Sequence, residues 1–473
     1  MSEKDILLGN IRSGQPLSIA ERLRLTLALS GPAILAQLAS VLLQFIDASM
    51  VGSLGAGPSA SIGLVSTSTW LCGGFCIALA QGFSVQVAHR LGANDPAGAR
   101  NVMREGIFVV TVFSLLLSLL AVSVSGALPR WLGGEEAIRS DASAYFRIYS
   151  AFIPAMQFCF FASTMLQCSG DMRTPSILDI LMCVLDVIFN FFLIFPTREV
   201  TLLGASVTIP GAGMGVRGAA LGTGLSEVIT AILTLYFLFV RNRDLSIVHH
   251  SGTFLPCRQT LKKAIGITGP LWLQNLVMRG AYIASTLIVA PLGAVSIAAN
   301  SFAIIAESFC YMPGYGMADA ATTLVGQSLG ASRKDMARSF AYITTALGTG
   351  LMVFLAVFMY IFAPAVMSVL SVDPDVVALG ARCLRMEAFA EAGYAISIVV
   401  FGACVGAGDT KIPTLLNLVS VWAVRIVLAI LLTPKYGLMG YWIAMLIELN
   451  VRGALFAGRI LGKKWMNTKL TSN

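Results

Sequence analysis

The sequence predicts an all-α polytopic membrane protein with twelve transmembrane helices in two pseudo-symmetric six-helix lobes. Composition is the first observation: the 473 residues are 56% hydrophobic and 12% charged, with a mean hydropathy of +0.80. Soluble globular chains carry about a quarter charged residues. Long apolar segments and an internal repeat are the other two observations. Together they predict a membrane protein of many spans, with the lipid bilayer as its surroundings.

Apolar segments between polar, glycine or proline breaks divide the chain into twelve predicted spans. Each segment is long enough to cross a bilayer as a helix. The predicted spans cover residues 23–51, 59–88, 105–128, 143–168, 174–196, 215–240, 262–290, 295–327, 338–364, 376–406, 412–433 and 437–461.

The two halves of the chain repeat each other at an offset of 238 residues. Six spans per repeat is an even number, so both halves cross the membrane in the same direction and their pseudo-twofold axis follows the membrane normal. The matched pairs are Gly31-Pro32 with Gly269-Pro270, Leu54-Gly55-Ala56 with Leu292-Gly293-Ala294, Leu91-Gly92-Ala93 with Leu329-Gly330-Ala331, Ala99-Arg100 with Ala337-Arg338, and Gly170-Asp171 with Gly408-Asp409. Two such lobes with a cleft between them are typical of a transporter, and they supply the cleft within one monomer.

The repeat and the spans give the predicted domain organisation. It comprises a cytoplasmic N-terminal segment (1–22), an N-terminal lobe (23–240), a cytoplasmic linker (241–261), a C-terminal lobe (262–461) and a cytoplasmic tail (462–473).

Positive charge predicts the orientation. Of the 32 lysines and arginines, 21 lie in the termini and the loops on their side of the membrane. Cytoplasmic loops carry such an excess, so we expect both termini in the cytoplasm of a cell with this protein in its inner or plasma membrane. The excess of lysine and arginine in these loops accounts for the net charge of +8. A nucleic-acid partner is therefore not expected.

One loop differs between the halves. The segment 197–214 after span 5 is about sixteen residues longer than its counterpart after span 11. Its alternating Val, Thr and Ile residues and closing glycines predict a short β-hairpin on the outer face. A lid and a tolerated surface insertion are the two interpretations.

Acidic residues within the predicted spans are the candidates for function. A carboxylate inside a bilayer costs several kcal/mol even on lenient scales, and it is kept for a purpose such as holding a proton or a cation. The acids are Asp47, Asp179, Asp186, Glu227, Glu307, Asp319, Glu387, Glu391 and Glu448, whereas only Arg279, Arg425 and Arg452 oppose them at depth. An interior that handles protons or sodium ions is therefore expected.

Asp47 in span 1 is the best candidate for cation coupling, with Asp186 and Asn190 in span 5 as its partners. Asp186 and Asn190 are four residues apart, so their side chains share one helix face. Competing interpretations are an Asp47 that caps the outer helix end and an Asn190 that joins spans by a hydrogen bond. Any sodium site is expected at these three residues, and no other metal site is predicted.

Four further residues are candidate contacts for the cation or the substrate: Gln44, Glu227, Glu307 and Glu391. Glu307 precedes Pro313, Gly314 and Gly316, which we expect to weaken the helix. A salt bridge from Glu307 to Arg279 or Arg425 is an equal alternative. Glu387 and Glu391 stand at i and i+4 of span 10, so we expect the two acids to face each other.

Aromatic and methionine side chains offer an apolar wall for a broad-specificity cleft. Ordinary helix packing is the competing interpretation for each of them. They are Trp70, Tyr282, Phe309, Tyr311, Met312, Tyr315 and Met317.

Several segments resemble the multidrug and toxic compound extrusion (MATE) family of secondary transporters. The resemblance covers nearly the whole chain, and the paired G-D-x-x-x-P loops and LGA turns make it specific. The segments are SGPAILAQLASVLLQFIDASMVGSLGA, AHRLGANDPAGAR, QCSGDMRTP, ESFCYMPGYGMADAATTLVGQSLGA and GACVGAGDTKIP.

The resemblance implies a V-shaped pair of six-helix lobes that exports organic, often cationic, drug-like compounds in exchange for protons or sodium ions. Two spans depart from the family pattern. In some branches span 5 carries Asn then Asp, whereas Asp186 precedes Asn190 here. The sodium-coupled branch has an acid in span 7, where this chain has Met278 and Arg279. The reversed order in span 5 keeps the same chemical groups and leaves open which of the two positions titrates. The departure in span 7 favours coupling through the first lobe.

Two other functions are alternatives to the transporter. A flippase for lipid-linked saccharides, from a related superfamily, would want a cationic cleft for pyrophosphate. A membrane enzyme lacks support, because the sequence has no Walker A motif, HExxH motif or paired-histidine metal site. The nine cysteines form no CxxC pair. We therefore expect a transporter that is not an enzyme and uses no cofactor other than the coupling ion.

Overall fold

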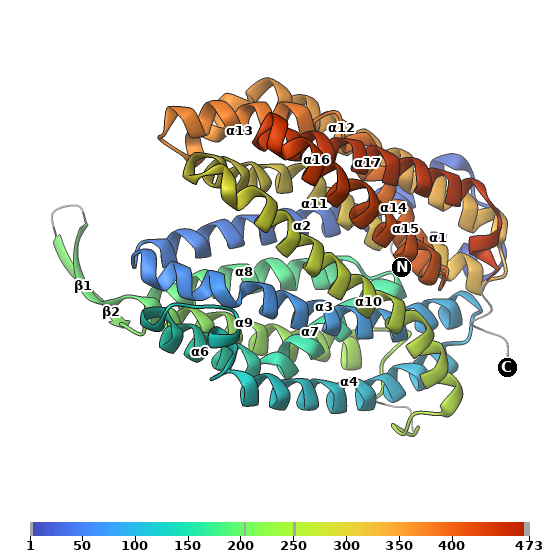
Figure 1. Ribbon diagram of the computed structural model, residues 1–473. Helices are drawn as coiled ribbons and strands as arrows, with labels where there is room; N and C mark the ends of the chain where they lie inside the picture. Colours follow the sequence, from blue (N-terminus) through green and yellow to red (C-terminus); the bar gives the residue numbers. More distant parts are fainter. Residues whose placement is uncertain (1–2, 203–204, 249–251, 468–473) are drawn as a thin grey trace.

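The computed structural model describes residues 3–202, 205–248 and 252–467, and these form an all-helical molecule with one β-hairpin (Figure 1). The first-lobe helices are α2 (Ile19–Gly52), α3 (Ala56–Gly92), α4 (Pro96–Val124), α5 (Leu128–Trp131), α6 (Glu136–Ala151), α7 (Ile153–Ser169), α8 (Arg173–Ile194) and α9 (Val216–Tyr236), followed by the π-helical turn η1 (Phe237–Arg241). The second-lobe helices are α10 (Arg258–Val289), η2 (Ala290–Leu292), α11 (Ala294–Gly330), α12 (Lys334–Leu370), α13 (Pro374–Glu387), α14 (Glu391–Gly406), α15 (Lys411–Val419), η3 (Ser420–Ile426), α16 (Val427–Tyr436) and α17 (Leu438–Leu461). Short helices α1 (Glu3–Arg12) and η4 (Lys464–Met466) lie near the termini.

Nine helices in the described part of the chain are long and apolar enough to cross a membrane, or eleven when each bent pair counts as one span. The bent pairs are α6 with α7, at 47°, and α13 with α14, at 60°. The last predicted span corresponds to α17, which carries Glu448 and Arg452 and is not among the helices counted. Large apolar side chains on the outer faces, such as Leu116 and Leu119 on α4 and Phe354 on α12, are exposed, as expected for contact with lipid.

The repeat is visible in the backbone. Helix α11 begins and ends 238 residues after α3, and the bent pairs fall at equivalent places in the two lobes. Asn94 and Ser332, which are also 238 residues apart, are the described non-glycine residues with a positive φ, at 56° and 60°. The same sequence pattern therefore produces the same turn after α3 and after α11.

The extra segment of the first half forms the predicted hairpin. Strands β1 (Pro196–Leu202) and β2 (Ala205–Ala212) pair antiparallel, with Val200 opposite Val207. The hairpin projects from the end of the molecule away from the C-terminus (Figure 1). The prediction of a hairpin in the segment 197–214 is confirmed, and its role stays a prediction.

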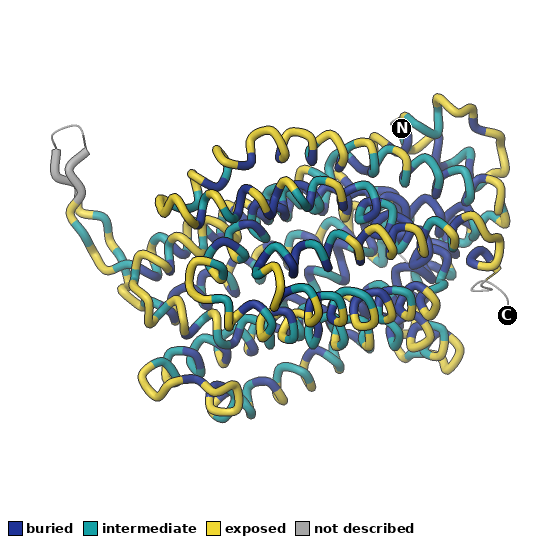
Figure 2. Tube along the Cα trace, turned by 45° about the horizontal axis from the view of Figure 1, so that its top comes forward, coloured by how far each residue is buried: buried dark blue, intermediate teal, exposed yellow. Residues whose placement is uncertain are grey.

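The two lobes meet tightly at the end that carries the termini, in a contact region that we call the terminal seam. Here α3 crosses α11, and a Cβ added to Gly92 would lie 2.1 Å from the Gln327 carbonyl oxygen. The pseudo-symmetric Gly330 stands equally close to the His89 carbonyl oxygen, at 2.1 Å. Because a side chain at either position would force the backbones apart, the two glycines set this close approach. Figure 2 shows buried residues gathered in this half of the molecule.

Helix α1 packs into the terminal seam, where the sequence analysis predicted no helix. Its buried Leu7, Leu8 and Ile11 lie in one apolar cluster with residues of α2, α11 and α12. Arg12, at its end, bonds to both lobes: Nη1 lies 2.7 Å from Asp244 Oδ2, Nη2 donates to the Ser169 carbonyl oxygen at 3.1 Å, and Nε donates to Gln327 Oε1 at 3.2 Å.

Helix α11 is continuous through Pro313, Gly314 and Gly316, so these residues do not unwind it in this structure. A Cβ on Gly316 would lie 2.7 Å from the backbone nitrogen of Ile34 on α2. The glycine therefore serves close packing of α11 against α2 rather than a break in the helix.

Candidate functional site

The structure brings the three predicted coupling residues together. Asn190 on α8 donates from Nδ2 to Asp47 Oδ1 on α2 at 3.0 Å and to Asp186 Oδ2 at 3.0 Å. Asp186 and Asn190 are each 1% exposed, whereas Asp47 is half-buried. We call these three side chains the first-lobe cluster. A single amide thus joins two carboxylates from different helices.

Local sequence explains this geometry. Four residues make about one turn of α8, so Asp186 and Asn190 lie one above the other on the face toward α2. Gly222 on α9 leaves room for the Asn190 amide, because a Cβ there would lie 2.1 Å from Asn190 Oδ1. The hydroxyl groups of Thr223 and Ser226 lie beside Asp186.

Two buried acceptors in the cluster lack a donor. Asp186 Oδ1 and Asn190 Oδ1 have no hydrogen-bond partner within the described ranges. Unsatisfied buried oxygens are costly, and a proton or a hard monovalent cation would satisfy them. No set of three His, Cys, Asp or Glu side chains with metal-binding geometry occurs in residues 3–202, 205–248 and 252–467. The donor set therefore fits a proton or a sodium ion.

Glu227 on α9 stands at the edge of this cluster. It is half-buried and lies within electrostatic range of Asp186 and Tyr149. The hydrogen bonds of the described residues do not join it to Asp47 or Asn190. Tyr145 on α6, which the sequence analysis did not single out, lies near both Asp47 and Asp186. No spacing pattern links α6 to α2, so the sequence held no signal for it.

A cavity of about 660 Å³ separates the lobes at the end that carries the hairpin. Three of the seven residues predicted as an apolar wall line it, namely Trp70, Tyr282 and Tyr311. Phe309, Met312, Tyr315 and Met317 are not part of the lining. The full lining is Val41, Gln44, Phe45, Ala48, Ser49, Trp70, Tyr282, Thr286, Val289, Ala290, Ile297, Asn300, Ser301, Phe302, Ile304, Ile305, Ser308, Tyr311, Val369 and Leu370.

Helix α2 connects the cavity to the first-lobe cluster. Gln44 and Ala48 face the cavity, while Asp47 reaches Asn190 inside the first lobe. The predicted Gln44 position is therefore suited to contact a substrate. The first-lobe cluster and the cavity wall therefore lie on neighbouring faces of the same helix, α2.

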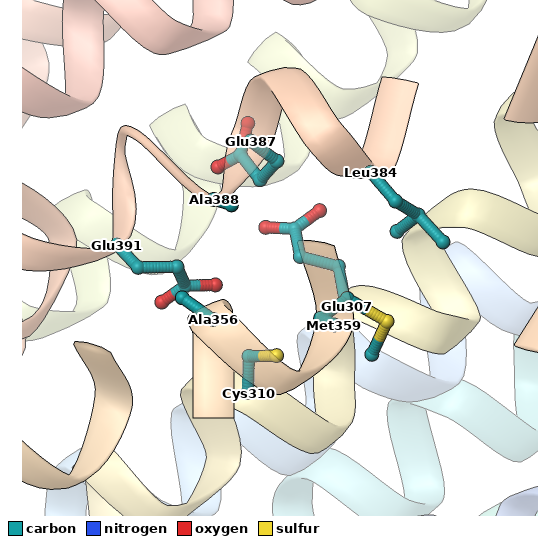
Figure 3. Close-up of a pocket in the computed structure, with 8 residues that line it drawn as sticks. All are labelled: Glu307, Cys310, Ala356, Met359, Leu384, Glu387, Ala388 and Glu391. Atoms are coloured by element: carbon teal, nitrogen blue, oxygen red, sulfur yellow. The ribbon is translucent and has the colours of Figure 1, made fainter. Parts of the chain in front are cut away.

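The second lobe holds a separate group of acids. Glu307, Glu387 and Glu391 surround a small internal space of about 10 Å³, together with Cys310 (Figure 3). Such a space holds about one water molecule. Both carboxylate oxygens of Glu387 and Oε2 of Glu391 have no hydrogen-bond partner among the residues placed by the structure.

Glu387 and Glu391 face the same small space, as expected, but they do not do so across one turn of a continuous helix. Helix α13 ends at Glu387, α14 begins at Glu391, and the two helices are bent by 60°. The three residues between them are Ala388, Phe389 and Ala390, so no proline or glycine announces the break. The two acids line the small space from different helices.

Glu448 on α17 forms ion pairs with two arginines, Arg425 and Arg452. Arg425 Nη2 lies 2.6 Å from Glu448 Oε2, and Arg452 Nε lies 3.0 Å from Oε1. Ser420 donates from Oγ to Oε1 at 2.6 Å. Ser420 and Arg425 belong to the π-helical turn η3, which places both side chains toward α17.

These ion pairs correct the alternative in which Glu307 pairs with Arg279 or Arg425. Arg425 is bound to Glu448, and the Arg279 guanidinium lies over the ring of Trp70, with its Cζ 5.2 Å from the ring centroid. The i, i+4 spacing of Glu448 and Arg452 was a signal for this pair that the sequence analysis did not use.

The MatE family model matches this chain over residues 32–192 and 270–431. The chain is 24% identical to a probable multidrug resistance protein NorM from Thermotoga maritima, over 92% of this chain and 91% of the relative. It is also 24% identical to a multidrug resistance protein MdtK from Yersinia enterocolitica, over 94% of this chain and 95% of the relative.

Solved structures share the fold. A MOP superfamily transporter from Pyrococcus furiosus superimposes with a TM-score of 0.85 at 20% identity, covering 98% of this chain and 99% of the other. A multidrug resistance MATE family transporter in an outward-facing conformation gives a TM-score of 0.85 at 21% identity, over 94% of this chain and 97% of the other. With both halves of the chain matched by the family model and the whole fold shared, the chain belongs to the MATE family of transporters.

Proposed function

We propose that this chain is a secondary active antiporter that exports organic compounds in exchange for protons or sodium ions. The names of its relatives, multidrug resistance proteins, support multidrug efflux. The coupling ion is the only cofactor in this proposal, and we expect no enzymatic activity. We place the protein in a bacterial inner or plasma membrane, with both termini in the cytoplasm, and working as a monomer.

The observation that carries the proposal is the amide of Asn190 between Asp47 and Asp186, with each Nδ2 to carboxylate distance at 3.0 Å. Two carboxylates held this close repel each other unless a proton or a cation reduces their charge. Binding of the ion therefore changes the force between α2 and α8. Since α2 also lines the interlobe cavity through Gln44, the change reaches the substrate.

Transport then follows from differential affinity. An ion or a substrate shifts the equilibrium between lobe arrangements only as far as it binds one arrangement more tightly than the other. In the arrangement described here, the terminal seam is closed and the cavity lies in the opposite half. With both termini cytoplasmic, this half faces outward, where substrate would leave and the ion would enter.

The test is gradient-driven export by Asp47→Asn in proteoliposomes loaded with a fluorescent dye. We expect export to fall about 100-fold, because the variant loses the titratable group while keeping its shape. Ser285→Ala is the matched control, since Ser285 is the residue 238 positions after Asp47 and is buried in the second lobe. We expect this control to keep export within about twofold. Undiminished export by a well-folded Asp47→Asn would overturn the assignment.

The coupling ion is tested in the same vesicles with one gradient at a time. A pH gradient without sodium and a sodium gradient at equal pH each drive export only if that ion couples. We expect the gradient that drives the unaltered protein to be the one that Asp47→Asn no longer uses.

A flippase for lipid-linked saccharides, the alternative function, would need several cations around its pyrophosphate. No lysine or arginine lines the cavity in the described part of the molecule. We therefore retain the antiporter.

A further inference from the structure

We propose that the interlobe cavity selects apolar organic anions, such as aromatic carboxylates, and that Arg279 supplies the charge that recognises them. The proposal rests on the proposed export function and specifies the chemical class of its substrate. It departs from the cationic compounds that the family resemblance implied.

The cavity wall carries no negative charge. Its polar side chains in the described structure are amides and hydroxyls, and the remaining lining is aliphatic or aromatic. They are Gln44, Ser49, Tyr282, Thr286, Asn300, Ser301, Ser308 and Tyr311. An organic cation would find no carboxylate on this wall.

The buried acids are turned into the lobes. Asp47 lies on α2, a wall helix, but it accepts the hydrogen bond of Asn190 inside the first lobe. Glu307 lies on α11, another wall helix, yet it lines the small space within the second lobe beside Glu387 (Figure 3). Asp47 and Glu307 therefore serve sites other than the interlobe cavity.

Arg279 is not part of the cavity lining but stands directly behind it, against the wall residue Trp70. One turn closer to the terminal seam, Asn275 Nδ2 donates to the Gly74 carbonyl oxygen at 3.3 Å, and this bond closes α10 against α3. One turn above these contacts, the Arg279 guanidinium lies over the ring of Trp70, with its Cζ 5.2 Å from the centroid. The Trp70 ring meets that of Tyr282 edge-on, at a centroid distance of 6.3 Å, and both rings line the cavity.

Arg279 has no carboxylate partner within the described ranges. The other two arginines at membrane depth, Arg425 and Arg452, share Glu448. Nε of Arg279 is buried and makes no hydrogen bond to the described residues. Its electrostatic neighbours are Tyr282, Tyr311 and Tyr315.

A charged side chain at membrane depth is costly when it has no partner, and it commonly marks a ligand path. The planar guanidinium matches a carboxylate or sulfonate through two parallel hydrogen bonds. Trp70, Tyr282 and Tyr311 offer flat apolar surfaces for the body of the same molecule. Charge and aromatic wall together fit a compound with an apolar body and one anionic group.

The experiment compares two probes with one aromatic body: 2-naphthoate and naphthalen-2-yl-trimethylammonium. Equilibrium binding to the full-length protein in nanodiscs is measured by isothermal titration calorimetry at equal pH and salt on both sides. We expect the unaltered protein to bind 2-naphthoate at least about tenfold more tightly than the ammonium probe.

Arg279→Gln removes the charge and keeps an amide, whereas Arg279→Lys keeps the charge and loses the planar fork. We expect Arg279→Gln to weaken 2-naphthoate binding at least tenfold and to leave the ammonium probe equal or tighter. Arg279→Lys should retain part of the preference. Ser285→Ala, outside the cavity lining, should change neither probe.

Equal or tighter binding of the ammonium probe by the unaltered protein would overturn the proposal. So would an Arg279→Gln protein, folded by size-exclusion chromatography, that binds both probes as before. If Arg279→Gln does not fold, the proposal is tested by the relative affinities of the unaltered protein and of Arg279→Lys for the two probes. Because binding at equilibrium needs no gradient, failure here is distinct from failure of coupling at Asp47.

Discussion

The two lobes share one backbone pattern but treat their buried acids differently. In the first lobe, an amide bridges Asp47 and Asp186, and no described lysine or arginine pairs with either. In the second lobe, Glu448 is neutralised by Arg425 and Arg452. The first lobe is thus able to take up a cation without breaking an ion pair, whereas the second carries a fixed pair that joins η3 to α17.

The repeat shows that this difference was introduced on a common scaffold. Each acid site falls on uncharged residues in the other lobe, so neither site is a relic of the other. At the offset of 238, the first-lobe cluster corresponds to Ser285, Val424 and Leu428, while Glu307, Glu387 and Glu391 correspond to Thr69, Tyr149 and Ile153.

Breaking the fixed pair of the second lobe should have the largest effect. Glu448→Gln leaves two arginines buried without a carboxylate, which costs about 3 to 5 kcal/mol in comparable buried pairs. We expect a clear fall in the free energy of unfolding, measured by denaturant titration in mixed micelles. Arg425→Met combined with Glu448→Met should recover part of that loss. A Glu448→Gln protein as stable as the unaltered one would show that the pair does not hold α17.

Asp186→Asn tests whether a buried acid of the first lobe, unlike Glu448 of the second lobe, can be neutralised without loss of stability. It removes one charge from a pair of like charges, so we expect stability to remain equal or to rise. Gradient-driven dye export should nevertheless fall about 10- to 100-fold, which corresponds to about 1.4 to 2.7 kcal/mol of coupling. Thr223→Val, which alters a neighbouring hydroxyl, is the control and should lose less export. Strong destabilisation by Asp186→Asn would contradict the comparison.

Glu387→Gln sharpens the comparison within the second lobe. Both carboxylate oxygens of Glu387 lack hydrogen-bond partners in the described structure, so a neutral amide of the same shape costs little. We expect export within about threefold of normal and unchanged stability, measured in the same assays, if coupling belongs to the first lobe. A loss as large as that of Asp186→Asn would place a second coupling site around Glu387 and Glu391.

Removing the hairpin should have the smallest effect. Replacing residues 198–210 by a two-residue Asn-Gly turn takes away the segment that distinguishes the halves. The strands pair with each other through their own register, so we expect stability and export to remain within about twofold. A drop of tenfold or more in export would support the lid interpretation.

Much of the first-lobe site was predictable from sequence, because it depends on local periodicity and on the cost of charge in a membrane. Asp186 and Asn190 lie four residues apart on one helix, and Asp47 was the isolated acid of its span. The hairpin was predictable from its alternating residues. These features need no knowledge of how the lobes pack.

The second-lobe site was less predictable, because it depends on a helix break without a sequence signal. The run from Glu387 to Glu391 contains alanines and a phenylalanine, so helix periodicity continues through the point where the backbone bends by 60°. The partner of Glu448 depends on the π-helical turn η3, which rotates Arg425 toward α17. Tertiary packing decides the bend and the position of Arg425, and neither leaves a trace in residue spacing. Only the second partner of Glu448, Arg452, is marked by its i, i+4 spacing.

The position of Arg12 affects the equilibrium between lobe arrangements. Its guanidinium ties the first lobe, through Ser169, and the linker, through Asp244, to Gln327 of the second lobe. Any motion that parts the lobes at this end must break one set of those bonds and uncover Leu8 and Ile11. A segment outside the predicted spans therefore sets part of the conformational bias of the whole molecule.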